Sequence, residues 1–264
     1  MEDDGTLTSD QKADFTTIYG QPDPRAYFRA LVPLEYQITQ QALPVVESVL
    51  EQHPGPVLDV CCSYGINATL LRHDIDLDGI GAHALDPARA GLAPEQVIAE
   101  DTALFAARRR QGFHLPVLGL DASGPAIDYA VATGLLDAGW AEDLEAADPS
   151  GSLIDALAEV TLVLCTGGVG YVGPATFDRI RTHAPDAWVL AFVLRVFPYD
   201  EVATALEGHG LVTEKLPGTF PQRRFADAAE AAAAIHDVQL LGLDPAGREA
   251  DGWFHAEAYL SRPG

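Results

Sequence analysis

The chain of 264 residues is predicted to adopt an α/β fold with a doubly wound, mostly parallel sheet of seven strands. Two observations predict this class. Apolar runs such as VLDVCC (57–62) and LPVLGLD (115–121) are typical of strands that are buried on both faces. Segments with helical patterns separate these runs, and alternating strands and helices favour a parallel sheet with helices on both sides.

The expected elements follow in order along the chain. Residues 14–52 are mostly helical in pattern, and the HPGP stretch (53–56) ends them with a hard break. The expected strands are 57–62, 115–121, 138–143, an apolar run ending at Cys165, 187–196, 211–225 and 251–263. The expected helices between them are 66–74, 123–136, 174–184, 199–210 and 226–242.

These elements predict three segments. Residues 1–13 form a polar tail that we expect to be disordered, 14–52 form an N-terminal helical lid, and 53–264 form the main domain. The main domain contains an insertion at 72–115, which we expect to be helical because it lacks a period-two pattern. The insertion could cover a pocket or extend a substrate site. Its RRR run (108–110) indicates either an anionic substrate or a solvated helix end.

The composition limits the possible partners. The 16 Lys and Arg residues against 39 Asp and Glu residues give a formal net charge of −23, spread along the chain. Such a protein repels nucleic acid and anionic membranes, whereas small molecules remain possible ligands. The N-terminus lacks a signal-peptide pattern, and the three cysteines make neither a disulfide framework nor a paired metal motif. We therefore expect a cytoplasmic protein without a metal that acts on a small molecule, with a homodimer as one open option for its assembly.

The candidate site lies where the strands end. In open α/β sheets, ligands bind outside the carboxyl ends of the strands, where the strand order reverses. Asp59 and the turn CCSYG end the first strand, Asp121 ends the second, and Asp143 follows the third. The glycines of CTGGVGYVG at the fourth strand allow an open backbone beside the same crevice. Together these positions predict a site of the size of an adenosine. Each carboxylate could instead simply cap a turn.

The order of VLDVCCSYG, VLGLDAS, WAEDLE and VTLVLCTGG, with two trailing strands, resembles class I S-adenosylmethionine-dependent methyltransferases. The resemblance covers about 55–70 and 115–261. It implies a Rossmann-like sheet, S-adenosylmethionine (SAM) as cofactor and methyl transfer to a small-molecule acceptor. The family usually carries an acidic residue and then three glycines at alternate positions in the first turn. Asp59 and Gly65 fit the first and last places, whereas Cys61 and Ser63 replace the two glycines between them.

The resemblance also implies roles for individual residues. It places the cofactor against Asp59, Cys61, Ser63, Gly65, Asp121, Ala122, Asp143, Thr166 and Gly167. Of the residues outside those motifs, Tyr171 is the candidate base, and Tyr19, Arg25 and Tyr36 of the lid are candidates for binding the acceptor. Ordinary packing is the alternative for each tyrosine.

The altered turn keeps three functions open. The first is methyl transfer, the second is another use of the sulfonium (cyclisation or aminocarboxypropyl transfer), and the third is a ligand-binding module without catalysis. A dehydrogenase is disfavoured because the first strand-to-helix turn, CCSYG, lacks the G-x-G-x-x-G fingerprint. We expect the turn to accept its cysteine and serine because only Gly65 should need a left-handed backbone.

Overall fold

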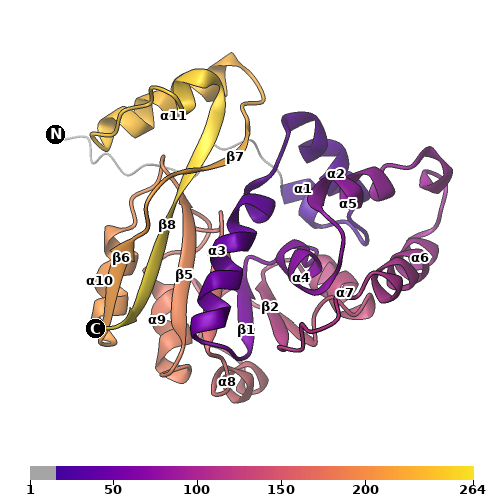
Figure 1. The fold of residues 1–264 in the computed structure, drawn as a ribbon, viewed down its shortest axis with the longest axis horizontal. Coiled ribbons are helices and arrows are strands. Elements are labelled where there is room, and N and C mark those ends of the chain that lie inside the picture. Colours follow the sequence, from indigo (N-terminus) through magenta and orange to yellow (C-terminus); the bar gives the residue numbers. More distant parts are fainter. Residues whose placement is uncertain (1–15) are drawn as a thin grey trace.

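The computed structural model describes residues 16–264, so the predicted tail and the first two residues of the predicted lid lie outside the described residues. One sheet of eight strands forms the centre of the molecule (Figure 1). The strands are β1 Val57–Val60, β2 Val117–Asp121, β3 Ala138–Ala141, β4 Leu162–Thr166, β5 Trp188–Leu194, β6 Leu211–Lys215, β7 Phe220–Arg224 and β8 Trp253–Pro263. The predicted α/β class is confirmed.

The strand order is β3-β2-β1-β4-β5-β8-β6, and β7 also pairs with β8. The pairs among β3, β2, β1, β4 and β5 are parallel, whereas β8 runs antiparallel to β5, β6 and β7. The chain proceeds from β1 to β2 and β3 on one side and then returns to β4 on the other. The strand order therefore reverses between β1 and β4, which is the place where ligands bind in such sheets.

The eighth strand arises because the predicted strand 211–225 is interrupted. Pro217 cannot donate a ladder hydrogen bond, and Gly218 has a φ of 91°. The segment therefore turns and forms two strands, β6 and β7, which pair with different parts of β8.

Helices cover both faces of the sheet, because the strands are apolar on both sides. Leu162 and Leu164 of β4 face one core cluster, while Val163 and Cys165 face the other. The first cluster contains side chains of α2, α3, α4, α7 and α11, and the second contains those of α8, α9 and α10. The helices are α1 Thr16–Tyr19, α2 Arg25–Leu31, α3 Ile38–Gln52, α4 Ile66–Arg72, α5 Leu77–Ala84, α6 Pro94–Ala107, α7 Gly124–Ala132, α8 Gly151–Leu157, α9 Pro174–His183, α10 Asp200–Gly208 and α11 Ala228–Leu240.

The segment 72–115 contributes α5 and α6 but no strand to the sheet, so the expected helical excursion is confirmed. The buried carboxylate of Asp101 fastens it to α7, since it accepts a hydrogen bond from the Tyr129 hydroxyl at 2.7 Å. Asp101 also pairs with His83 and Arg89. In the part of the chain from residue 16 onward, no helix is long and apolar enough to cross a bilayer.

Candidate functional site

A cavity of about 1230 Å³ opens at the carboxyl ends of β1, β2, β3 and β4. The ends of these strands form its floor, and residues of α1, α2, α3, β7 and α11 form its walls. Sites for one small molecule usually measure roughly 300–1,000 Å³. The cavity therefore has room for a cofactor and a second small molecule beside it.

The turn after β1 has an unusual backbone. Cys61 has a φ of 58° and Ser63 a φ of 51°, and both are left-handed like Gly65, whose φ is 76°. The expectation that only Gly65 adopts this conformation is wrong. The left-handed conformation costs residues with a Cβ about 1–2 kcal/mol. The glycines that the resembled family has at these two positions would adopt the same backbone without this cost.

Hydrogen bonds to β2 hold the strained turn in place. The backbone N–H of Cys61 donates to the carbonyl of Leu120 at 2.8 Å. The N–H of Ser63 donates to Oδ2 of Asp121, also at 2.8 Å. The hydroxyl of Ser63 lies in the wall of the cavity, where its Oγ is buried without a hydrogen-bond partner.

Gly65 contributes to packing, and it is absent from the cavity wall, contrary to the expectation of a cofactor contact. A Cβ at this position would lie 3.2 Å from Cβ of Ala130 and 3.3 Å from Cβ of Leu135. The glycine therefore lets α4 approach the end of α7.

Cys61 lines the cavity and directs its sulfur toward the loop after β4. A Cβ added to Gly168 would lie 2.8 Å from the Sγ atoms of both Cys61 and Cys165. The hydrogen bond with Cys165 and burial raise the pKa of the Cys61 thiol. The Cys61 thiol therefore stays protonated and serves as a small neutral group in the cavity wall.

Asp59 is only 1% exposed and does not line the cavity, which corrects the expected contact with the cofactor. Its Oδ1 accepts a hydrogen bond from Nδ2 of Asn67 at 2.9 Å. Nδ2 of Asn67 also lies 3.3 Å from the Thr166 hydroxyl, and both of these residues do reach the cavity. Oδ2 of Asp59 has no partner, and burial raises the pKa of this carboxyl to about 7. Asp59 thus positions Asn67, which the sequence reading missed because it sits in the apolar run INATLL.

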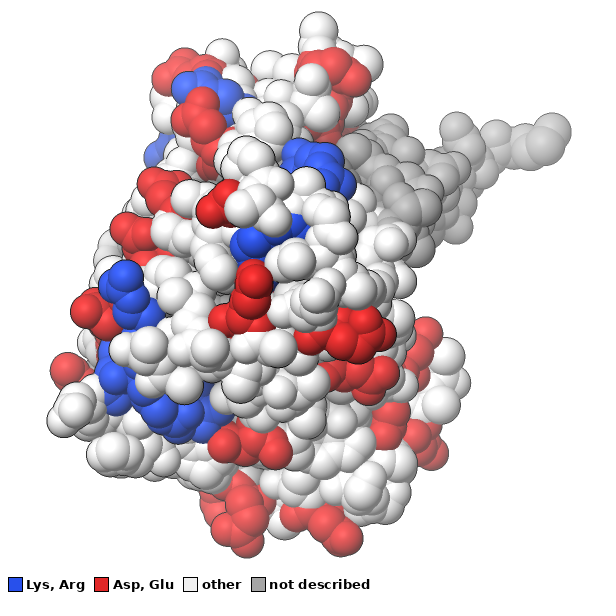
Figure 2. Space-filling model, turned by 90° about the vertical axis from the view of Figure 1, so that its right-hand side faces the viewer, with Lys and Arg blue, Asp and Glu red and all other residues white. Residues whose placement is uncertain are grey.

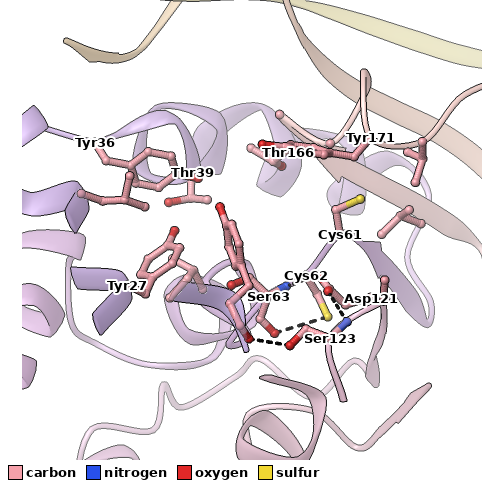
Figure 3. Close-up of a pocket in the computed structure, with 18 of the residues that line it drawn as sticks. Tyr27, Tyr36, Thr39, Cys61, Cys62, Ser63, Asp121, Ser123, Thr166 and Tyr171 are labelled. Carbon is pink, nitrogen blue, oxygen red and sulfur yellow. Dashed lines mark hydrogen bonds between the residues drawn. The ribbon is translucent and has the colours of Figure 1, made fainter. Parts of the chain in front are cut away.

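Asp121 lies in the cavity wall at the end of β2, as expected, next to Ala122. Its two oxygens accept from the backbone N–H groups of Ser63, at 2.8 Å, and Ser123, at 2.9 Å. Burial raises the pKa of this carboxyl. Each carboxylate oxygen can accept a further hydrogen bond, so Asp121 can hold the turn and a ligand hydroxyl together (Figure 3).

Asp143 and Gly167 also line the cavity. Asp143 is exposed and accepts hydrogen bonds from the backbone N–H groups of Glu145, at 2.9 Å, and Ala146, at 3.3 Å. It follows β3 by two residues, so it caps a turn at the rim of the cavity.

The three candidate tyrosines, Tyr19, Tyr36 and Tyr171, all line the cavity. The ring centroid of Tyr27 lies 5.7 Å from that of Tyr19 and 6.1 Å from that of Tyr36, whereas Tyr171 lies near Thr166 (Figure 3). Tyr171 is 53% exposed and stands at the rim. Burial raises the pKa of Tyr36 to about 12, so this phenol is a hydrogen-bonding group rather than a base near neutral pH.

Short contacts hold the N-terminal helices over the first turn. The Ser123 hydroxyl donates to the carbonyl of Tyr19 at 2.5 Å, and the Tyr64 hydroxyl donates to that of Ile18 at 2.8 Å. Arg25 lies away from the cavity, which corrects its expected contact with the acceptor. Its guanidinium pairs with Asp23 at 2.8 Å and donates to the carbonyl of Arg89 at 2.7 Å, so it ties α2 to the insertion.

The RRR run does not reach the cavity either, so it offers no site for an anionic substrate there. Nη1 of Arg110 pairs with Oε1 of Glu47 on α3 at 2.7 Å. Figure 2 views the side of the molecule that carries α5 and α6, and it shows acidic residues spread over this whole face.

Asn67 is not the only polar residue of the cavity wall that was missed from the sequence; others are Thr39 of α3, and Gln222 and Arg223 of β7. Gln222 and Arg223 belong to a polar run, PQRR, that carries no apolar pattern and no known motif. Thr39 stands in an otherwise ordinary amphipathic helix. Only the packing of α3 against β7 brings them to the strand ends.

Comparisons with known proteins bear on the fold. No family model and no curated protein sequence matches the chain. Its structure is similar to that of a TehB-like SAM-dependent methyltransferase from Corynebacterium glutamicum, with 13% identity, 83% of this chain and 86% of that chain covered, and a TM-score of 0.42. It is also similar to magnesium protoporphyrin IX methyltransferase from Synechocystis with bound S-adenosylhomocysteine (SAH), with 11% identity, 96% and 93% covered, and a TM-score of 0.44.

A third similar structure is a functionally unknown protein from Deinococcus radiodurans, with 16% identity, 85% and 88% covered, and a TM-score of 0.44. The two named enzymes are SAM-dependent methyltransferases, the class whose motifs the sequence resembles. At these identities and TM-scores the likeness assigns no function or ligand to this chain, and both have to be inferred from its own residues.

Proposed function

We propose that the cavity binds SAM and that the protein transfers a methyl group from it to a small-molecule acceptor. One observation carries this proposal. Four adjacent parallel strands end on one cavity at the reversal of the strand order, and the ends of β1, β2 and β4 present Ser63, Asp121 and Thr166 to it. This is the arrangement in which α/β sheets bind nucleosides.

The polar groups of the cavity suit the parts of SAM. The free lone pairs of Asp121 would accept from the ribose hydroxyls, and Asp143 at the rim would accept from the adenine amino group. The unpartnered Oγ of Ser63 would donate to the carboxylate of the methionine part, beside Asn67 and Thr166. An orphaned buried hydroxyl is costly, so a ligand that satisfies it gains affinity.

The charge of the protein supports the same ligand. SAM carries a cationic sulfonium, and it supplies the electrophilic methyl group when bound. The net charge of −23 attracts a cation and repels polyanions. The acceptor is therefore proposed to be a small molecule rather than nucleic acid.

The chain's own residues would position the acceptor and exclude water. The N-terminal helices cover the turn through Ser123 and Tyr64, and the tyrosines of the wall enclose the acceptor end of the cavity. When the acceptor must lose a proton, Tyr171 at the rim would take it up in its tyrosinate form and pass it on to water, which remains a prediction.

One feature favours a second candidate, the use of another bond of the sulfonium. The Cys61 side chain stands where the family has glycine, against the loop after β4. A side chain there would shift the methionine part and could expose a different carbon to attack.

Product analysis separates the candidates. The protein is incubated with SAM and a panel of small acceptors, and the products are identified by mass spectrometry. Methyl transfer yields SAH, whereas aminocarboxypropyl transfer yields methylthioadenosine. Binding of SAM without either product would indicate a ligand-binding module.

A further inference from the structure

The residue Gln222 occupies an irregular position in β7. This strand pairs with β8 through Phe220 with Ala256 and Pro221 with His255, and the pairing then resumes between Arg223 and Phe254. Gln222 is therefore the extra residue of a β-bulge. Bulges redirect side chains and are common beside active sites.

The bulge turns two successive side chains toward the cavity. Gln222 is 5% exposed and Arg223 is 2% exposed, and both line the cavity. In a regular strand, successive side chains would point to opposite faces. The chain thus departs from the regular ladder at the one place where β7 meets the cavity.

The backbone of the bulge is firmly held. The N–H of Gln37, just before α3, donates to the carbonyl of Gln222 at 2.7 Å. Arg223 pairs with Glu230 of α11 at 2.9 and 2.6 Å, and its guanidinium lies 4.7 Å from the ring centroid of Phe254. The Gln222 side chain is therefore presented from a fixed position.

The amide group of this side chain lies beside Gly167, just after the end of β4. Its Nε2 lies 3.1 Å from where a Cβ on Gly167 would be. Its Oε1 is buried and has no hydrogen-bond partner, and the same holds for Oγ1 of Thr39 on the neighbouring α3. Both side chains line the cavity, so two polar atoms without hydrogen-bond partners lie in its wall.

In its described residues, this part of the wall offers no unpaired positive charge. Among the described residues that line the cavity, Arg223 is the one basic side chain, and its partner Glu230 neutralises it. Asp227 accepts hydrogen bonds from the N–H groups of Ala229 and Glu230, each at 2.9 Å. An anionic acceptor would therefore meet no uncompensated positive charge, whereas a neutral molecule would lose little on entering.

We propose that Gln222 determines the acceptor class, accepting at Oε1 a hydrogen bond from the N–H or O–H of an uncharged acceptor and so holding it beside Gly167. Thr39 binds a second polar group of the same molecule. This assignment rests on the proposed function. In the transfer, the acceptor atom bonds to the methyl carbon, the carbon–sulfur bond breaks with its electrons on sulfur, and the acceptor's proton leaves to water.

The test uses resorcinol, its dimethyl ether and 3-hydroxybenzoate as probes. Binding to the full chain is titrated by ligand-observed NMR, with and without saturating SAH. We expect resorcinol to bind at least about tenfold more tightly than either other probe, because only it is neutral and able to donate two hydrogen bonds. Gln222→Met should reduce this preference to about twofold, while Gln222→Glu, which keeps acceptor oxygens, should retain the preference over the ether.

Gln239→Met is the matched control, because Gln239 is exposed on α11 outside the cavity. It should leave the preference unchanged, and circular dichroism checks the fold of each variant. Equal binding of the probes to the wild type, no binding of resorcinol, or an unchanged preference in Gln222→Met overturns the assignment. If SAH fails to bind the wild type, the proposed function falls, and the titrations without SAH still decide the role of Gln222.

Discussion

Replacing Ser63 by glycine tests the backbone of the first turn. Ser63 is left-handed, with a φ of 51°, and its buried Oγ lacks a partner. The structure therefore predicts that Ser63→Gly stabilises the protein, although most substitutions at buried positions destabilise. Ser63→Ala is the matched comparison, since it removes the hydroxyl and keeps the Cβ.

The magnitude follows from two opposing effects. Relief of the left-handed strain contributes about 1–2 kcal/mol. The extra freedom of glycine in the unfolded chain offsets about 0.4–1 kcal/mol of this. Ser63→Gly should thus exceed Ser63→Ala in free energy of unfolding by about 0.5–1 kcal/mol, which corresponds to a rise of roughly 1–4 °C in Tm for a chain of this size.

Urea unfolding followed by circular dichroism measures the difference, with the slope of the transition checked for each variant. SAH affinity, measured in parallel, should fall by roughly 1.5–3 kcal/mol in both variants, because both lack the Ser63 Oγ that we propose donates to the cofactor carboxylate. A Ser63→Gly variant less stable than Ser63→Ala would refute the left-handed conformation.

Two further predictions concern residues placed outside the cavity. Asp59 has a pKa of about 7, above its value in the unfolded chain, so the folded state holds a proton that the unfolded state loses between about pH 4 and 7. The contribution of Asp59 to stability therefore falls as pH rises. Relative to the wild type, the free energy of unfolding of Asp59→Asn should increase by at most about 1.4 kcal/mol per pH unit in that window. Unfolding curves of both proteins at pH 5, 6 and 7 measure this, and a difference that stays constant with pH would contradict the burial of the carboxyl. Arg25→Ala should lower the free energy of unfolding by about 1–2 kcal/mol, because it removes the bonds to Asp23 and Arg89. SAH affinity should change less than about twofold. A large loss of affinity with little loss of stability would instead indicate that Arg25 contacts the ligand.

The strands were predictable wherever burial on both faces left an apolar run. VLDV, VLGLD, LVLCT and WVLAFVL all became strands close to the expected positions. The strand β7 was not separated from β6 in the sequence reading, since PQRR is polar and contains a proline. Its bulge depends on pairing with β8, which no local pattern reveals.

The site was predictable in its outline and less so in its contacts. Asp121 and the three tyrosines reach the cavity, because strand ends and the N-terminal helices converge there. Asp59 was expected to contact the ligand, but it lies outside the cavity and accepts a hydrogen bond from Asn67, which it positions. Left-handed cysteine and serine residues are also invisible to a sequence reading, since side chains with a Cβ rarely adopt this conformation.

Calorimetric titration of SAH into the wild type and into Asp121→Ala tests the central claim most directly. Asp121 lies in the cavity wall and accepts from the N–H of Ser63, so its loss removes both the proposed ribose contact and a support of the turn. We expect saturable one-to-one binding to the wild type and affinity at least about tenfold weaker in the variant, a difference of about 1.4 kcal/mol or more. No binding to the wild type at millimolar SAH, or equal affinity in a folded Asp121→Ala, would contradict the account.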